Sequence, residues 1–378
     1  AHLRADGLPA AAAHPHGLPV TARPPCRLPS ESARRCGPPV SVVVATCRRP
    51  RQLVACVRSV LASDYPRFEV VVVDNAPHEP ATRAALTEAF GGESRLHYLT
   101  EPVPGTSRAR NRGAVAATGE LVAFTDDDVE VDPGWLTALV AAFQAEPNVG
   151  CVTGLTHPAE FETPAQLWFE QHSGFARGHQ RRVFSADTTP PPTRLYPYTC
   201  GVFGAGGNSA FRPEVLRGLG GFDVRLGPGT RTHGGEDLDL FLRVVLAGHR
   251  VVYEPRALAR HHHRREQEQL YRQVGTYGAG ATAMLTKWWL RSPELRRLLR
   301  RGLLPVLREP PGPESGRAPL PRRLPPSWPP CPPWLAAVER AGHLRGPSLW
   351  ALAVLLARWG RPPARPRPGP GSPVWRAR

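Results

Sequence analysis

The chain has 378 residues and a mass of 41.2 kDa, which excludes a minimal domain that depends on disulfides or metals for stability. Its 45 Pro are concentrated near the two ends, and most of the net charge of +16 falls in residues 287–378, which hold 18 Lys and Arg against four Glu. The nearly neutral centre of the chain is therefore predicted to be the folded part.

Cysteine usage and hydropathy exclude further classes. The seven cysteines are scattered without a C-x-x-C pair, which argues against a disulfide framework and against a zinc ribbon. No run reaches the roughly 18 apolar residues of a membrane span, and no apolar core of a secretory signal is evident near the start of the sequence. We therefore expect a protein of a reducing compartment, the cytoplasm.

Short apolar runs alternate with helical spacing over the first part of the chain. Strands are predicted at 40–45, 68–73, 96–100 and 121–125, with helices near 53–61, 80–90 and 108–117 between them. A further helix is predicted from Asp132 and Pro133, as N-cap and first helical residue, to Phe143. This alternation is typical of an α/β protein whose sheet grows by parallel crossovers.

The second part of the chain has a weaker pattern. A strand is predicted at 149–155, a helix near 166–172, a helix from Pro213, a helix at 236–247, a strand at 250–253 and mostly helix over 266–304. The predicted organisation is a disordered segment at 1–38, a catalytic domain at 39–265, an amphipathic helical extension at 266–304 and a mostly disordered Pro- and Arg-rich tail at 305–378.

Three consecutive carboxylates, Asp126, Asp127 and Asp128, follow a buried strand. Ligands bind at this carboxyl edge in open α/β sheets. In an extended backbone Asp126 and Asp128 point the same way and can share a hard cation such as Mg²⁺ or Mn²⁺. The alternative is an acidic surface loop, but Asp132 already supplies a cap for the following helix.

Further polar residues are placed where they could complete a site. Asp74 ends the second strand, Glu236 and Asp237 begin a helix, and His261 follows a late strand. Each has a simpler alternative role. Asp74 could be a turn residue, Glu236 and Asp237 could be partners of the helix dipole, and His261 could be a solvated side chain.

Together these motifs resemble glycosyltransferase family 2, whose members are inverting enzymes with the nucleotide-sugar-binding GT-A fold. The resemblance covers about 39–265. It rests on V-S-V-V-V-A-T at Val40, E-V-V-V-V-D-N at Glu69, G-T-S-R-A-R-N-R-G-A at Gly105, F-T-D-D-D-V at Phe124, G-G-N-S-A-F-R at Gly206, G-G-F-D at Gly220 and G-G-E-D-L-D-L at Gly234. The basic run Cys47-Arg48-Arg49 departs from the usual loop after the first strand.

The resemblance implies a Rossmann-like, mostly parallel sheet with flanking helices, and a role for each matching residue. Asp237 would be the general base with Glu236 beside it, and Gly206, Gly207 and Asn208 would shape the donor and acceptor pocket. Asp126, Asp128 and His261 would hold Mg²⁺ or Mn²⁺. The donor nucleotide would be bound by Thr46, Asp74, Arg108, Arg110, Asp126 and Asp127.

Chemistry supports those roles. A leaving diphosphate needs its growing charge stabilised, which a divalent ion supplies as a Lewis acid, and the acceptor hydroxyl needs a base. One base and one displacement would invert the anomeric configuration. The implied partners are a nucleotide diphosphate sugar and a glycan or lipid-linked acceptor, with a role in bacterial cell-wall or polysaccharide synthesis.

Two alternatives remain at this stage. A nucleotidylyltransferase acting on sugar phosphates uses a related sheet, although its usual G-x-G-T-R-L loop is absent here. A basic nucleic-acid-binding protein would use the Arg-rich tail, with Trp328 and Trp334 stacking on bases.

The basic helical region suggests a second partner. Arginines beside Trp288, Trp289, Leu298 and Leu299 fit an amphipathic helix at an anionic membrane, which would place the protein peripherally on the inner face of the plasma membrane. An ordinary helix packed on the catalytic domain is the alternative.

Overall fold

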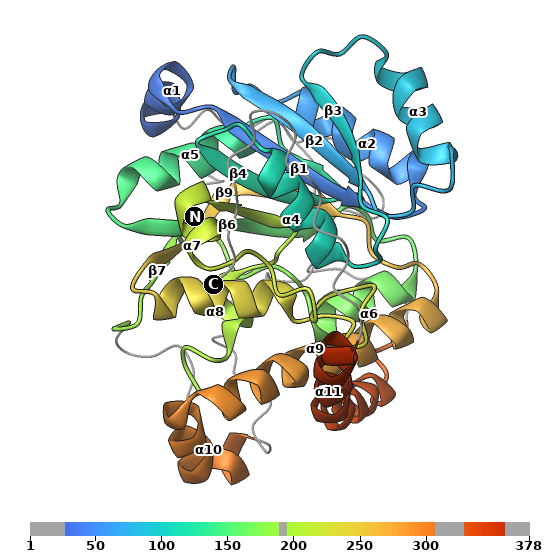
Figure 1. Cartoon of the computed structure of the whole chain (residues 1–378), viewed down its shortest axis with the longest axis vertical. Coiled ribbons are helices and arrows are strands. Elements are labelled where there is room, and N and C mark those ends of the chain that lie inside the picture. Colours follow the sequence, from blue (N-terminus) through green and yellow to red (C-terminus); the bar gives the residue numbers. More distant parts are fainter. Residues whose placement is uncertain (1–26, 189–194, 307–328, 360–378) are drawn as a thin grey trace.

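A mixed sheet forms the centre of the protein, whose computed structural model describes residues 27–188, 195–306 and 329–359. The strands are β1 (Val40–Thr46), β2 (Phe68–Asp74), β3 (Leu96–Thr100), β4 (Leu121–Asp126), β5 (Val129–Val131), β6 (Val149–Pro158), β7 (Arg182–Phe184), β8 (Asn208–Phe211) and β9 (Arg250–His261). Their order is β3-β2-β1-β4-β8-β6-β9-β5, and β7 also pairs with β9 (Figure 1).

The sheet is parallel only in part. β3, β2, β1 and β4 run parallel, as expected for strands joined by helices. β8 lies antiparallel between β4 and β6, and β5 and β7 are antiparallel to β9. β6 and β9 also run parallel to each other, so among the described strands only β5, β7 and β8 run against the rest. The α/β class and the mostly parallel sheet are therefore confirmed. The described residues between β7 and β8 form turns and one short 3₁₀ helix, Cys200–Phe203. They contain no helical crossover that would require β8 to be parallel.

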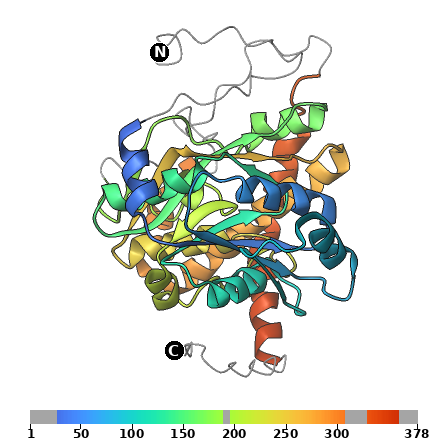
Figure 2. The same cartoon turned by 90° about the horizontal axis from the view of Figure 1, so that it is seen from above.

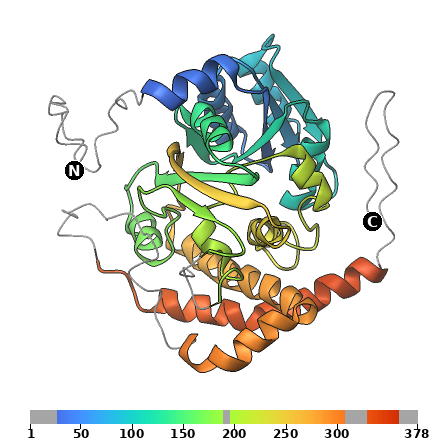
Figure 3. The same ribbon diagram turned by 90° about the vertical axis from the view of Figure 1, so that its left-hand side faces the viewer.

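Helices cover both faces of the sheet and form a further layer (Figures 1 and 3). They are α1 (Arg27–Cys36), α2 (Pro50–Leu61), α3 (Ala81–Phe90), α4 (Thr106–Ala116), α5 (Trp135–Ala145), α6 (Pro164–His172), α7 (Pro213–Gly218), α8 (Glu236–Leu246), α9 (Gln267–Arg291), α10 (Pro293–Val306) and α11 (Trp334–Trp359). In β1, Val42 packs into the core with α2 and α5, whereas Val43 packs into the core with α4 and α8. Burial on both faces explains the unbroken apolar run of this strand.

The helix expected from Asp132 begins later than predicted. α5 starts at Trp135 with Gly134 at the N-cap. The Asp132 side chain accepts a hydrogen bond from Gly134 N at 2.9 Å. Asp132 therefore closes a turn before the helix, because its short side chain reaches the backbone two residues on.

Both ends of the chain contain helices where disorder was predicted. α1 lies within 1–38 and packs Ala33 against α5. α11, of 26 residues, lies within 305–378 and packs along α9, and Figures 2 and 3 show it extending along one side of the molecule. The prediction was wrong for these two segments because the prolines of each end lie mostly outside the helices. Residues 1–26, 307–328 and 360–378 lie outside the described residues.

Pro347 lies inside α11, where it removes one helical hydrogen bond. The carbonyl that loses its partner belongs to His343, and Thr282 of α9 donates its hydroxyl to that oxygen at 2.9 Å. The packing of the two helices thus replaces the bond that proline removes.

The amphipathic face predicted for membrane contact is largely used inside the protein. Trp288, Leu298 and Leu299 pack against the core that contains α8, whereas Trp289 and Leu290 are 46% and 59% exposed. No helix in the described parts of the chain is both long and apolar enough to cross a bilayer.

Gly342 and Gly346 of α11 allow its close approach to α9. A Cβ atom on Gly346 would lie 2.0 Å from Thr282 Oγ1 and 2.5 Å from Ala279 O. We therefore expect Gly346→Ala to force the helices apart and to lower the free energy of unfolding by roughly 1–3 kcal/mol, measured by thermal and denaturant unfolding.

Gly218→Ala is the matched control, because a Cβ atom there would meet no other atom within 4 Å. An unfolding midpoint unchanged by Gly346→Ala would contradict the packing of α11 on α9.

Candidate active site

Three polar residues end neighbouring parallel strands at one edge of the sheet. Thr46 ends β1, Asp74 ends β2 and Asp126 ends β4. The strand registers pair Thr46 with Asp74, and Ala45 with Asp126. The structure thus brings these predicted site residues to the edge where α/β sheets bind ligands.

The three aspartates do not remain in an extended strand. β4 ends at Asp126, and the chain turns at Asp127 and Asp128 before β5. The alternation that was expected to align Asp126 with Asp128 therefore does not apply. Asp126 pairs with Arg110, whereas Asp127 and Asp128 both pair with Arg49.

Arg49 is a residue of this site to which the sequence analysis gave no role. Its Nη1 atom lies 3.0 Å from Asp127 Oδ1 and 2.8 Å from Asp128 Oδ2, and Thr46 donates its hydroxyl to Asp127 at 2.8 Å. Burial raises the pKa of Asp127 to about 6, repulsion from Asp128 adds to this rise, and Arg49 opposes it. The signal in the sequence that could have indicated a role for Arg49 was the unusually basic loop after β1.

His261 lies beside Asp128 at the end of β9. Its Nε2 atom is 3.4 Å from Asp128 Oδ1, and its Nδ1 atom is 2.8 Å from Nδ1 of His263. His263 in turn contacts Glu170 at 2.8 Å. Burial lowers the pKa of His261 to about 4, against the attraction of Asp128, so the imidazole is neutral at pH 7. β5 and β9 create this contact by pairing Val129 with His261.

Arg110 of α4 joins the two groups of acidic residues that the sequence places far apart. Its Nη2 atom lies 2.6 Å from Asp126 Oδ1, and its Nη1 atom lies 3.1 Å from Glu236 Oε1. The guanidinium is buried and stacks over Phe222 at 5.4 Å. Its Nε atom has no hydrogen-bond partner within the described residues. Arg110 was expected to bind the donor, but here it bridges two carboxylates.

Glu236 and Asp237 differ in their surroundings although they are adjacent at the start of α8. Glu236 is buried, and burial raises its pKa to about 7, with repulsion from Asp237 adding to the rise and Arg110 opposing it. Asp237 is half-buried, and its Oδ2 atom accepts a hydrogen bond from Gly206 N at 3.1 Å. Of the two, Asp237 has the carboxylate that a ligand can reach.

Two glycines separate the carboxylates of β4 and α8. A Cβ atom on Gly206 would lie 2.7 Å from Cβ of Asp237, and one on Gly207 would lie 2.3 Å from Oδ2 of Asp126. Only glycine allows the backbone to approach both side chains this closely. Asp126 and Asp237 therefore lie on either side of one short loop.

Asn208 has no polar atom to offer a ligand. Its side chain is buried, accepts a hydrogen bond from Trp135 Nε1 at 2.8 Å, and donates to the carbonyls of Leu155 and Ala257 at 3.1 and 3.0 Å. It shapes the pocket only indirectly, because it holds the glycine loop against β6 and β9.

Asp74 and Arg108 complete the set of predicted donor-site residues. Asp74 is buried and accepts hydrogen bonds from Tyr98 Oη and Ala76 N, each at 2.8 Å. Arg108 is half-buried, and no hydrogen bond or ion pair of its side chain occurs within the described residues. Arg108 is thus a cation whose charge no carboxylate of these residues neutralises.

The sequence matches a known family over the part of the chain that forms most of this site. Residues 41–216 match the family model described as glycosyl transferase family 2. A pre-mycofactocin glycosyltransferase of Mycobacterium tuberculosis is 30% identical over 221 residues, which cover 58% of this chain and 43% of the relative. This chain therefore spans less than half of that relative.

Two further relatives match over similar parts of the chain. The succinoglycan biosynthesis protein ExoM of Rhizobium meliloti is 30% identical, with 58% of this chain and 65% of the relative covered. A glucosyl-dolichyl phosphate glucuronosyltransferase of Haloferax volcanii is 27% identical, with coverages of 59% and 68%.

Among solved structures, a mannosyltransferase of Pyrobaculum calidifontis, in complex with GDP-Man and Mn²⁺, superposes with a TM-score of 0.49 and 19% identity. The superposition covers 88% of this chain and 78% of that one. The family match and the glycosyltransferase relatives agree with the order of the motifs along the chain. Residues 41–216 therefore form a domain of glycosyltransferase family 2.

Proposed function

We propose that this glycosyltransferase moves a sugar from a nucleotide diphosphate to an acceptor hydroxyl, with inversion at the anomeric carbon. The observation that carries the proposal is the loop of Gly206 and Gly207, which has Asp126 on one side and Asp237 on the other. No side chain of this loop separates a carboxylate on the donor side from a carboxylate on the acceptor side.

On the donor side, the proposal assigns the nucleotide to the edge formed by β1, β2 and β4. Asp74 accepts a hydrogen bond from the nucleobase, since each carboxylate oxygen can accept more than the one bond it has here. Thr46 and Asp127 hold the adjoining turn in place. Arg108 supplies positive charge for the diphosphate.

On the acceptor side, Asp237 takes the proton from the attacking hydroxyl. Its half-buried carboxylate is fixed by Gly206 N, whereas Glu236 is buried and paired with Arg110. A single base and a single displacement invert the anomeric carbon, and no second carboxylate has to act as a nucleophile.

The residues present fit a divalent cation beside the diphosphate. Within the described residues, no three His, Cys, Asp or Glu side chains stand together as a ready metal cage. Mg²⁺ commonly takes only one or two protein carboxylates and completes its shell with substrate phosphates and water. Asp128 and the neutral His261 provide a carboxylate and an imidazole 3.4 Å apart, and Asp126 is the third proposed ligand. A bound cation would stabilise the charge that develops on the leaving diphosphate.

The names of the relatives support a glycan or lipid-linked acceptor. One relative is named for a glucosyl-dolichyl phosphate acceptor and another for succinoglycan biosynthesis. For this chain we propose the same broad class, an acceptor within polysaccharide or glycolipid synthesis.

The alternative functions gain no support. The family match is to glycosyltransferases and not to nucleotidylyltransferases. Trp334, proposed to stack on bases, instead packs edge-on against Trp168 and lies beside Tyr271. Trp328 lies outside the described residues.

A peripheral contact with an anionic membrane remains a proposal, now restricted to a smaller surface. Trp289 and Leu290 are exposed at the end of α9, next to the exposed Arg291, and Arg297 and Arg300 follow on α10. Aromatic and apolar side chains beside arginines suit the interface of an anionic bilayer.

The first prediction tests the function and the base together. The purified chain should release nucleoside diphosphate from at least one member of a panel of nucleotide sugars when acceptor is present. Asp237→Asn should keep donor binding, since the donor side is unchanged, and lose roughly 10²–10⁴-fold in turnover, measured by diphosphate release and calorimetry. If turnover is normal in Asp237→Asn while Glu236→Gln is inactive, the base is Glu236; normal turnover in both contradicts the mechanism.

The second prediction concerns the cation. Exhaustive chelation should abolish turnover, and Mg²⁺ or Mn²⁺ should restore it. His261→Ala should raise the Mn²⁺ concentration needed for half-maximal donor binding by at least about tenfold, measured by calorimetry. His262→Ala is the control, because His262 contacts Glu130 and Glu160 instead. Full turnover in the chelated protein would remove the cation from the mechanism.

The third prediction concerns the membrane. Full-length protein should sediment with vesicles that contain anionic lipid, and replacing Trp289 and Leu290 by Ser should reduce the bound fraction. Neutral vesicles and the exposed-leucine variant Leu344→Ser serve as controls. Equal sedimentation of the double variant and the unaltered protein would rule out this surface.

A further inference from the structure

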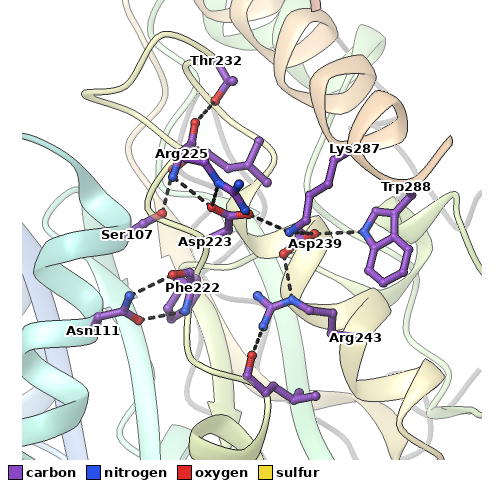
Figure 4. A network of polar contacts seen from close by, with 12 residues as sticks. Ser107, Asn111, Phe222, Asp223, Arg225, Thr232, Asp239, Arg243, Lys287 and Trp288 are labelled. Atoms are coloured by element: carbon purple, nitrogen blue, oxygen red, sulfur yellow. Dashed lines mark hydrogen bonds and ion pairs between the residues drawn. The ribbon is translucent and has the colours of Figure 1, made fainter. Parts of the chain in front are cut away.

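Lys287 is the only lysine among 48 basic Lys and Arg residues, and it is buried in α9. Its Nζ atom lies 2.8 Å from Asp223 Oδ2 and 2.6 Å from Asp239 Oδ1 (Figure 4). The side chain is 3% exposed. One ammonium group therefore joins a loop and a helix that both belong to the catalytic region.

Asp239 connects this ion pair to the start of α8. It lies two residues after Asp237 and is fully buried. Besides Lys287 it accepts hydrogen bonds from Trp288 Nε1 at 2.9 Å and from Arg243 Nε at 2.8 Å. The position of the first turn of α8 thus depends on groups supplied by α9.

Asp223 connects the same ammonium to the loop that leads into α8. Arg225 binds it at 2.7 Å, and both cations hold the pKa of Asp223 well below its usual range, against the effect of burial. Arg225 also stacks over Trp350 of α11 at 4.9 Å. Lys287 of α9 and Trp350 of α11 therefore both contact this loop.

The other anchors of the loop lie on α4, the helix that carries Arg110. Ser107 donates its hydroxyl to Leu226 O at 2.7 Å, and Asn111 exchanges two hydrogen bonds with the backbone of Phe222, at 2.9 and 2.8 Å. The loop is held by α4 on one side and by Lys287 on the other, as Figure 4 shows.

The chemistry of the side chain suits this position. An ammonium is a compact charge with three donors, whereas a guanidinium is a wide planar fork. Without the ammonium, two buried carboxylates lose a cation that they share, and the remaining cationic partner of each is an arginine from its own segment. Arg225 would still bind Asp223, and Arg243 would still bind Asp239 and the carbonyl of Leu219 at 2.7 Å. No cation would then join the two carboxylates.

We infer that Lys287 is a positioning residue for the reaction, which fixes the start of α8 and so the Asp237 carboxylate relative to the donor side. The inference rests on the proposed role of Asp237 as the base. Lys287 and Asp237 both lie beyond the residues matched by the family model, which end at 216, so the geometry of the base depends on the C-terminal part of this chain.

The test compares Lys287→Met, Lys287→Arg and Glu254→Gln in the full chain. Glu254 is a buried carboxylate paired with Arg256 on β9, and its loss removes a buried ion pair outside the network. At a temperature well below every unfolding midpoint, Lys287→Met should lower kcat by on the order of 10²-fold, since displacement of a reacting group by about 1 Å has that effect. The Kd for the nucleotide sugar should change less than about threefold, because Asp74 and Asp126 lie on strands outside the network.

The remaining variants complete the test. Lys287→Arg should restore less than half of the lost kcat, and Glu254→Gln should lower stability without changing kcat. Trp288→Phe, which removes a single hydrogen bond to Asp239, should lower kcat by a smaller factor, and it keeps the inference testable if Lys287→Met does not fold.

A normal kcat in Lys287→Met, or an equal loss of kcat in Glu254→Gln, would overturn the inference. Full activity of Asp237→Asn would instead contradict the proposed base, and the two failures are therefore distinguishable.

Discussion

One buried guanidinium determines how the acidic groups of the active site are arranged. Arg110 lies between Asp126 at the end of β4 and Glu236 at the start of α8, and the buried Glu236 carboxylate needs a cation as its partner. The sheet positions the first carboxylate, the helix positions the second, and the arginine fixes the distance between them. The two-glycine loop can then approach Asp126 and Asp237 from the same side.

A second cation, Arg49, pairs with the acidic turn after β4, on the proposed donor side. Arg49 pairs with both Asp127 and Asp128, so the three consecutive aspartates are divided between an arginine that precedes α2 and an arginine on α4. This division leaves Asp128 beside a neutral His261, whose other ring nitrogen is held by His263. The proposed donor and acceptor sides thus have separate charge clusters, one around Arg49 and one around Arg110.

The helices after β9 also take part in the charge network around α8. α9 provides Lys287 and Trp288 to Asp239, and α11 provides Trp350 to Arg225. Apolar residues beside arginines and frequent prolines are the only signals in the sequence of this region, and they predict an amphipathic extension and a disordered tail. Packing between helices uses those apolar residues internally, and Thr282 satisfies the carbonyl that Pro347 leaves without a partner.

The sequence by itself determined the α/β class, the strands that end in Thr46, Asp74 and Asp126, and the family, because strand patterning and short motifs depend on residues that are near one another in the chain. Only the tertiary structure decided which charges neutralise one another. Arg110 and Glu236 are 126 residues apart, and Arg49 and Asp128 are 79 apart. Such pairs depend on the order of the strands and the entry of β8 between β4 and β6. Local patterns carry no information about either, because ion pairing acts through space and not along the chain.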